Sequence, residues 1–311
     1  MFYRENISII QMKLLIICLF LPNRQAINAA RRLEVVVDHV FRMSRAFLKN
    51  SEVKFISLED AAKLKTGTRV TMSPGFPALY AECLKNICYT KRIPVIRVKH
   101  VNIGKDRKTG EDRQKRLFEL TAQTSLPVMW HNDERPRSSW IEQLALCERI
   151  GAPNSPKLVP GDMHLRKDMF GLCALVLAED GYCWNMRIQQ KSKLAMKYGY
   201  SKEASKEAPY KMAAILKLIC DRLEQQHRKG SRFLVGDSLT AVDIYMATMS
   251  YSIQPPDEAF MPRTKLTKMM DVMFGVKNPV VKAAITPRLM EHRDFILRTY
   301  CEVPVVLGGG N

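Results

Sequence analysis

A segment rich in proline and glycine, residues 151–161, divides this chain into two parts with different hydrophobic patterns. Its three prolines and two glycines cannot continue a helix, so we expect a linker. Before it, over 67–150, short β-prone runs alternate with amphipathic helical stretches. After it, over 162–303, the apolar spacing is helical throughout. The sequence therefore predicts a small α/β domain, an all-helical domain and a flexible tail at 304–311.

The order of elements in the α/β domain is that of a thioredoxin-like fold. Strands are expected at 68–72, 94–101 and 127–130, and helices at 78–91, 113–120 and 138–150. The helical domain is expected to consist of helices at 163–177 with a continuation to 195, 208–229, 240–253, 266–276 and 280–299.

The segment around Pro127 has two interpretations. Pro127 stands between a small polar pair and a short apolar run, and a helix opens on Ser138 and Ser139 soon after. In a thioredoxin-like fold such a proline is cis, its neighbours' backbone groups face outward, and the helix start offers unpaired N–H groups to a carboxylate. A trans proline at a strand start with an ordinary serine N-cap fits the same residues.

Charge and metal-binding residue types limit the partners. The net charge of +18 favours anionic partners, but basic residues are scattered and no nucleic-acid-binding signature accompanies them. Nucleic-acid binding is therefore not expected. The eight cysteines and six histidines have no metal-ligand spacing, so no metal is predicted, and no disulfide framework is indicated.

The N-terminus carries a separate signal. Residues 12–21 form an apolar run behind one lysine, as in a secretory leader, and the run is too short to span a membrane as a helix. Removal of 1–30 as a signal, retention as a membrane-contacting helix, and a mis-predicted start all stay open. The cysteine pattern favours the cytoplasm, with secretion or membrane association as the alternative. Residues 31–66 are expected to add helices at 33–48 and 58–64.

Residues 233–245 contain the most specific motif. Thr240 can cap a helix whose third residue, Asp243, can return a hydrogen bond, which makes a capping box before an apolar run. This stretch resembles the helix-start motif in the C-terminal domain of glutathione S-transferases. With 73–85, 91–94 and 126–128, the resemblance covers roughly residues 55–300, and 167–172 and 181–187 are similar to a poorly characterised subgroup.

The resemblance implies a glutathione transferase fold and a function. We expect a thioredoxin-like domain followed by a helical bundle, with glutathione as co-substrate and no metal. The predicted reaction conjugates the glutathione thiol to small hydrophobic electrophiles, as in detoxification. The alternative is a non-catalytic binding or dimerisation module of the same fold, and a homodimer stays open in either case.

The resemblance also implies site residues. Backbone groups of Leu126 would pair with the cysteinyl part of glutathione, and the helix start would hold its γ-glutamyl carboxylate. Ala78 stands where many members carry the serine or cysteine that acts on the thiol, which leaves Tyr80 or Ser73 as catalytic candidates. Packing of Tyr80 and turn formation by Ser73 are the structural alternatives. The substrate-binding candidates are Leu126, Pro127, Arg137, Ser138, Ser139, Trp184 and Arg187.

Two of these candidates need a further remark. Arg137 stands where the family usually has Glu or Gln, a departure that affects recognition of the γ-glutamyl amine. Trp184 and Arg187 would line the electrophile pocket, although core packing explains Trp184 equally well.

Overall fold

The computed structural model describes residues 53–99, 112–189, 191–261, 267–268 and 274–308. The leader predicted at 1–30 and the helix predicted at 33–48 lie outside these residues, as does most of the helix predicted at 266–276. In the described part of the chain, no helix is both long enough and apolar enough to cross a membrane.

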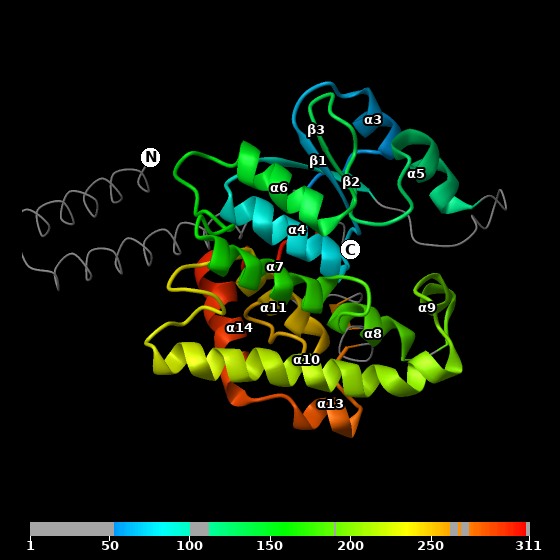
Figure 1. The fold of residues 1–311 in the computed structure, drawn as a ribbon. Helices are drawn as coiled ribbons and strands as arrows, with labels where there is room; N and C mark the ends of the chain where they lie inside the picture. The colour runs from blue at the N-terminus through cyan, green and yellow to red at the C-terminus, as the bar shows by residue number, and fades with distance from the viewer. Residues whose placement is uncertain (1–52, 100–111, 190, 262–266, 269–273, 309–311) are drawn as a thin grey trace, which may run out of the picture. The chain divides into compact units, whose positions relative to one another are not determined.

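The α/β part is built on a three-stranded sheet with β1 (Thr68–Met72) in the centre. It pairs in parallel with β2 (Val95–Lys99) and antiparallel with β3 (Met129–His131). Helices α4 (Leu79–Thr90) and α6 (Trp140–Ile150) lie toward the helical part, while α3 (Leu58–Lys63) and α5 (Arg113–Thr121) lie on the other side of the sheet (Figure 1).

Both faces of the sheet carry a hydrophobic core, which explains why all five residues of β1 are buried. Val70 and Met72 pack into the large core that includes α4 and α6. On the other side, a smaller cluster consists of Leu58, Ala61, Val98, Leu117, Val128 and Trp130. A strand buried on both faces must be apolar or have its polar groups bonded, and the buried Arg69 guanidinium donates to the carbonyls of Ala61, Leu64 and Asn132.

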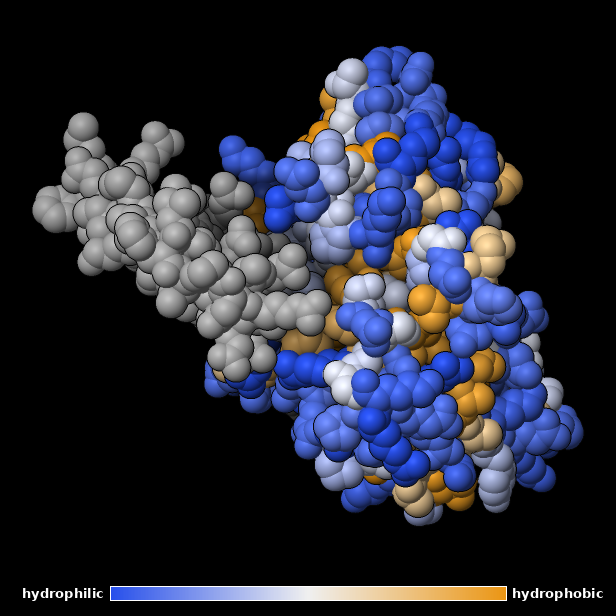
Figure 2. Space-filling view, turned by 60° about the vertical axis from the view of Figure 1, so that its left-hand side comes forward, coloured by the Kyte–Doolittle hydropathy of each residue, from blue (hydrophilic) through white to orange (hydrophobic). Residues whose placement is uncertain are grey.

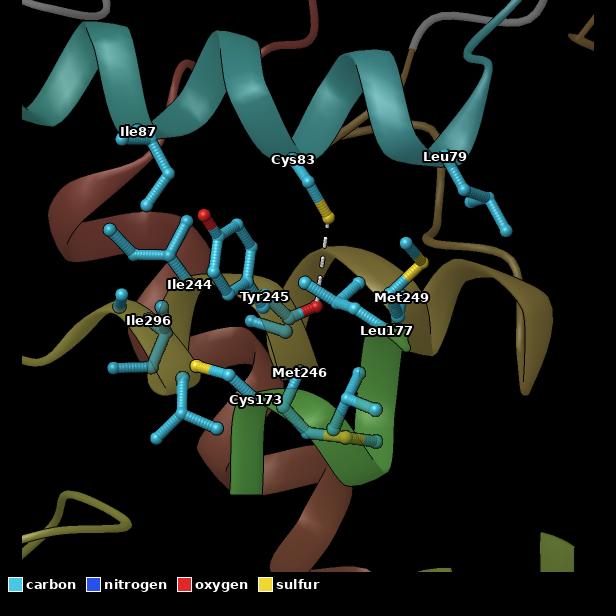
Figure 3. Close-up of a cluster of buried hydrophobic side chains, with 14 of the residues drawn as sticks. Leu79, Cys83, Ile87, Cys173, Leu177, Ile244, Tyr245, Met246, Met249 and Ile296 are labelled. Carbon is cyan, nitrogen blue, oxygen red and sulfur yellow. Dashed lines mark hydrogen bonds between the residues drawn. The ribbon is translucent and has the colours of Figure 1, made fainter. Parts of the chain in front are cut away.

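The helical part is arranged around α11 (Ala241–Met249), all of whose residues are buried. Figure 3 shows Cys83 and Ile87 of α4 pointing toward Ile244 and Tyr245 of α11. The surrounding elements are α7 (Met163–Leu177), α8 (Tyr182–Ile188), α9 (Lys193–Lys197), α10 (Lys202–Arg228), the 3₁₀ turn η2 (Ser250–Ser252), α13 (Pro279–Ala283) and α14 (Pro287–Tyr300).

Three helix boundaries differ from the sequence prediction. The helix expected to continue from 177 to 195 is interrupted, because Asp180 takes a left-handed backbone (φ 61°) and Gly181 lies against the preceding turn. A Cβ at Gly181 would lie 2.8 Å from the Ala174 carbonyl oxygen, so only glycine fits there. Helix α10 starts at Lys202 and continues through Pro209. The helix expected at 280–299 is divided before Pro287, which starts α14.

The prediction of a flexible tail is wrong for residues 304–308. Val305 and Val306 are buried, and the Val305 N–H donates to the Phe260 carbonyl at 2.7 Å. Lys85 Nζ and Arg97 Nη1 both donate to the Val306 carbonyl, at 3.2 and 2.8 Å. The tail therefore returns from the helical part to the α/β part. It is held there mainly through its backbone groups, which every residue type has, so the sequence carries no indication of this contact.

Residues 53–66 also belong to the α/β part. Ile56 forms a parallel bridge with Val98 of β2, and α3 packs on α5 and β2. The predicted division at residue 66 therefore separates residues that share one core.

Asp243 is the polar centre of the helical part. Its carboxylate is fully buried and accepts the Thr240 N–H at 2.9 Å, the Thr240 hydroxyl at 2.8 Å and the Leu234 N–H at 2.7 Å. His292 Nε2 lies 3.0 Å from Oδ1 of the same carboxylate, the oxygen that also accepts the Leu234 N–H. This capping box thus fixes the start of α11, the preceding loop and α14 together.

We predict that Asp243→Asn lowers the free energy of unfolding by about 2–3 kcal/mol, because an amide cannot accept from all of these donors and loses the charge that strengthens each bond. Urea denaturation measures the change. Asp237→Asn is the matched control, since Asp237 is exposed one turn before the helix, and it should leave stability nearly unchanged. Equal effects of the two substitutions would contradict this account of Asp243.

Candidate functional site

A cavity of about 270 Å³ lies between the α/β part and the helical part. Its volume lies just below the range of about 300–1,000 Å³ that is typical of small-molecule sites. It is lined by Tyr80, Cys83, Leu84, Ser125, Leu126, Pro127, Ser138, Ser139, Trp140, Gln143, Leu177, Ala178, Glu179, Trp184, Arg187, Tyr198 and Tyr245. On the face drawn in Figure 2, most of the surface is hydrophilic and hydrophobic residues gather near the middle.

The loop at Pro127 forms one wall of the cavity. The Leu126–Pro127 peptide bond is cis, as the first interpretation of this segment predicts. The Val128 N–H donates to Thr71 Oγ1 at 2.7 Å, and Gln143 Nε2 donates to the Pro127 carbonyl at 2.8 Å. These two bonds hold the loop to β1 and α6. No described residue bonds the backbone N–H or carbonyl of Leu126, which leaves both groups available to a ligand.

The start of α6 forms the adjoining wall. Ser139 is the N-cap residue, and its side chain makes no capping bond. Within the described chain the backbone N–H groups of Trp140, Ile141 and Glu142 also lack partners, as the first turn of a helix requires unless a side chain or ligand supplies them. The Ser138 hydroxyl donates to Gln123 Oε1. This corner of the cavity suits an anion.

Tyr80, in the first turn of α4, reaches the cavity with its hydroxyl already engaged. Tyr80 Oη donates to the Leu177 carbonyl at the end of α7, at 2.7 Å. Burial raises the pKa of the Tyr80 phenol well above its ordinary value. The hydroxyl thus joins the two parts of the molecule, and it keeps its proton at neutral pH. Ala78, the N-cap residue of α4, makes no side-chain bond and does not line the cavity.

The helical part supplies the opposite wall through Trp184, Arg187 and Tyr198. Trp184 Nε1 donates to the Tyr198 carbonyl at 3.0 Å, and the two rings meet edge to face with centroids 4.7 Å apart. The Arg187 guanidinium lies 4.5 Å from the Tyr80 ring centroid and 4.4 Å from that of Tyr198. These contacts fall within the range of cation–π attraction.

The structure separates the other candidates from this cavity. Ser73 does not line it, and the Ser73 carbonyl accepts the Phe76 N–H in a turn. Arg137 does not line it either, since its guanidinium donates to Glu134 Oε2 at 2.6 Å and its backbone pairs with Met129. Thr240 and Asp243 act in the helical core.

Several residues that line or support the cavity were not predicted from the sequence. Gln143 and Thr71 position the Pro127 loop, but each stands in an ordinary helical or strand pattern, so the sequence carries no signal for them. Glu179 follows the end of α7 and Tyr198 the end of α9, where helical periodicity gives no information.

The cysteines near the cavity are not activated. Cys83 and Cys183 are buried free thiols, and burial raises the pKa of Cys83 well above its ordinary value and that of Cys183 to about 12. A buried thiol of this kind is inert as a nucleophile. Among the described residues, no group of His, Cys, Asp or Glu is arranged to hold a metal ion.

Comparison with known proteins identifies the helical part. Residues 183–275 match the sequence model of a family described as glutathione S-transferase, C-terminal domain. No curated protein matches the chain.

Solved structures resemble most of the chain in fold. A glutathione S-transferase from Methylobacterium radiotolerans, in complex with glutathione sulfonate, is 17% identical, with a TM-score of 0.51 over 78% of this chain and 96% of its own. Maleylacetoacetate isomerase from Methylobacterium extorquens AM1, with bound malonate and glutathione, is 16% identical, with a TM-score of 0.50 over 78% and 99%. A glutathione S-transferase from Methylobacillus flagellatus, with glutathione bound, is 14% identical, with a TM-score of 0.50 over 74% and 94%.

The described chain therefore has the glutathione transferase fold, in which a thioredoxin-like α/β part precedes an all-helical part. Residues 183–275 match the C-terminal domain family of glutathione S-transferases, and the α/β part before them completes the fold that these enzymes have.

We predict that Tyr80→Phe lowers the free energy of unfolding by about 1–2 kcal/mol, because the Leu177 carbonyl loses its buried donor. Thermal or urea unfolding measures this loss. Tyr210→Phe, at a residue 66% exposed on α10, is the matched control and should have little effect. If Tyr80→Phe leaves stability unchanged, the hydroxyl does not join the two parts.

Proposed function

We propose that the cavity binds glutathione and that the protein conjugates its thiol to a second, electrophilic substrate. The observation that carries the proposal is the meeting, in one cavity, of the free backbone groups of Leu126, the open start of α6, and an aromatic wall from the helical part. The fold neighbours from Methylobacterium and Methylobacillus with glutathione or its sulfonate bound support it.

Two groups on the α/β wall suit the peptide part of glutathione. The unpaired N–H and carbonyl of Leu126 match the pairing of an extended peptide backbone, which also presents one donor and one acceptor. The N–H groups at the start of α6, with the Ser139 hydroxyl, match a carboxylate. Glutathione offers both, since its cysteinyl unit is flanked by a γ-glutamyl group with a free carboxylate.

Glu179 is suited to the γ-glutamyl ammonium. Arg137, at the position where the resemblance leads one to expect Glu or Gln, is committed to Glu134. Among the described residues that line the cavity, Glu179 is the single carboxylate, and it lies at the exposed end of α7. The Glu179 carboxylate would attract the γ-glutamyl ammonium, which Arg137 cannot bind because it is itself a cation.

Ala78 has no hydroxyl to stabilise the glutathione thiolate, and the backbone N–H groups at the start of α4 would take over this role. The N–H groups of Leu79, Tyr80 and Ala81 have no partner within the described chain, and they form the positive end of α4. A helix N-terminus favours a thiolate over a thiol. Catalysis by this route needs no proton from Tyr80, whose hydroxyl is engaged with Leu177.

We predict that Ser139→Ala weakens glutathione binding by about tenfold, because the carboxylate loses one charge-assisted hydrogen bond. Ser139 makes no capping bond in the free protein, so the substitution removes no cap from α6. Isothermal titration calorimetry gives the affinity. Ser238→Ala, at an exposed serine outside the cavity, is the control and should bind as the unchanged protein does. Equal affinity of the two variants would exclude the α6 corner as the carboxylate site.

We further predict that the thiol of bound glutathione titrates at a lower pH than that of free glutathione, since the start of α4 favours the thiolate. The thiolate absorbance near 240 nm, followed against pH in the complex, measures the shift. Turnover of 1-chloro-2,4-dinitrobenzene should rise with pH through the same transition. The Tyr80→Phe variant should retain both the turnover and its pH dependence. Binding with neither the shift nor turnover would instead support the non-catalytic module.

A further inference from the structure

Arg187 is an uncompensated cation in the wall of the cavity. Its side chain is half-buried, and none of its guanidinium N–H donors has a hydrogen-bond or ion-pair partner among the described residues. The other half-buried arginines among the described residues have hydrogen-bond or ion-pair partners. Arg97 contacts Glu302, and Arg222 contacts Asp168. A partly desolvated charge without a partner costs stability, so its presence calls for a ligand.

The two tyrosine rings define which part of Arg187 is free. The guanidinium carbon lies over the faces of Tyr80 and Tyr198, at 4.5 and 4.4 Å from their centroids. Ring contacts of this kind occupy the faces of the planar group, whereas its N–H donors lie in the plane. The in-plane donors match two oxygens of a carboxylate.

The charges around Arg187 make the site more positive. Lys197, at the end of α9, donates to the Thr124 carbonyl. Burial and repulsion by Arg187 lower the pKa of Lys197, so the two cations sense each other. Glu179 also lines the cavity but lies beyond ion-pair distance of Arg187. An anion bound at Arg187 would relieve this repulsion.

We propose that the second substrate is an electrophile that carries a carboxylate, and that Arg187 binds this carboxylate. The proposal rests on the function proposed above. It narrows the substrate class from a small hydrophobic electrophile to an amphipathic one, whose apolar body lies against Trp184 and the tyrosine rings while its acid group meets Arg187.

Glutathione has carboxylates of its own, and the residues proposed for its peptide part and γ-glutamyl carboxylate lie on different elements from Arg187. Leu126 and Ser139, which suit the peptide, belong to the α/β wall. Arg187 belongs to α8 of the helical part and stands among aromatic side chains. The cation therefore belongs to the aromatic wall, and the experiments must distinguish a carboxylate of the second substrate from a carboxylate of glutathione.

A matched pair of substrates tests the proposal: 4-chloro-3-nitrobenzoate and its methyl ester. In both, the glutathione thiolate attacks the ring carbon that carries chlorine, a C–S bond forms, chloride leaves with the C–Cl electron pair, and the thiol proton goes to solvent. The two compounds differ in the carboxylate that Arg187 would bind. Each rate is divided by the uncatalysed rate, because the ester is intrinsically more reactive.

We expect Arg187→Met to lower kcat/KM for the acid by about 10–100-fold, the effect of losing a charge-assisted bidentate contact, with at most about a twofold change for the ester. Arg187→Lys should restore part of the acid activity because a cation remains. Arg228→Met, at an exposed arginine outside the cavity, controls for net charge and should change neither rate. Thermal unfolding of each variant verifies that it is folded.

Three results would overturn the proposal. Equal losses for acid and ester, with a raised pKa of the bound thiol, would assign Arg187 to the thiolate. A loss confined to glutathione affinity would assign it to the tripeptide. Equal activity of Arg187→Met and the unchanged protein on the acid would show that Arg187 does not bind the substrate carboxylate.

A binding measurement separates this proposal from the function on which it rests. Calorimetry with 3-nitrobenzoate and its methyl ester, in the presence of S-methylglutathione, needs no turnover. Preferential binding of the acid that is lost in Arg187→Met supports the carboxylate site even if conjugation fails. Equal binding of acid and ester contradicts it even if conjugation of neutral substrates succeeds.

Discussion

The packing of α4 against α11 determines whether this molecule has a site at all. Leu79, Cys83 and Ile87 point from α4 into a core shared with α7 and α11 (Figure 3), and the cavity opens beside this contact. One side of α4 therefore belongs to the sheet domain and the other to the helical core. A shift of α4 would move Tyr80 and the positive helix end together, so the geometry of the site depends on the interface.

Polar contacts give that interface a fixed register. Apolar packing is non-directional, whereas hydrogen bonds restrict distance and angle. The Lys85 ammonium lies 2.6 Å from Glu82 and 3.1 Å from Glu302 of the returning tail, although all three side chains are largely buried. Asn86 Nδ2 donates to Thr248 Oγ1 of the 241–249 helix at 3.1 Å. Sliding of α4 would break these contacts in a medium where unpaired charges are costly.

Sequence patterns predicted what depends on local periodicity and turn chemistry. The strand at 68–72 and the helices near 79–90 and 140–150 follow from such patterns. The cis bond before Pro127 was one of two interpretations of its segment, and the structure decides between them. Contacts between distant residues had no such signal. Nothing local indicates that Tyr80 donates to Leu177, or that Gln143 holds the Pro127 loop, because both bonds arise only when two parts of the chain pack. The interruption after α7 was missed because apolar periodicity does not show that Asp180 takes a left-handed backbone and that Gly181 packs against the carbonyls of the preceding turns.

Packing alone does not explain why a charged side chain, Arg187, lies in the aromatic wall of the cavity. Trp184, Tyr80 and Tyr198 present aromatic surface to the cavity beside Arg187, and replacing a poorly compensated buried charge by an apolar group of similar volume often stabilises a protein. Cation–π contacts offset part of the cost of Arg187, and partial exposure to the cavity offsets more. What remains is a guanidinium edge directed at no described group of the chain. A ligand of opposite charge would supply the ionic partner that the Arg187 guanidinium lacks in the part of the free protein that the structure describes. This distinguishes the aromatic wall from a purely apolar pocket, which would gain nothing from a charged ligand.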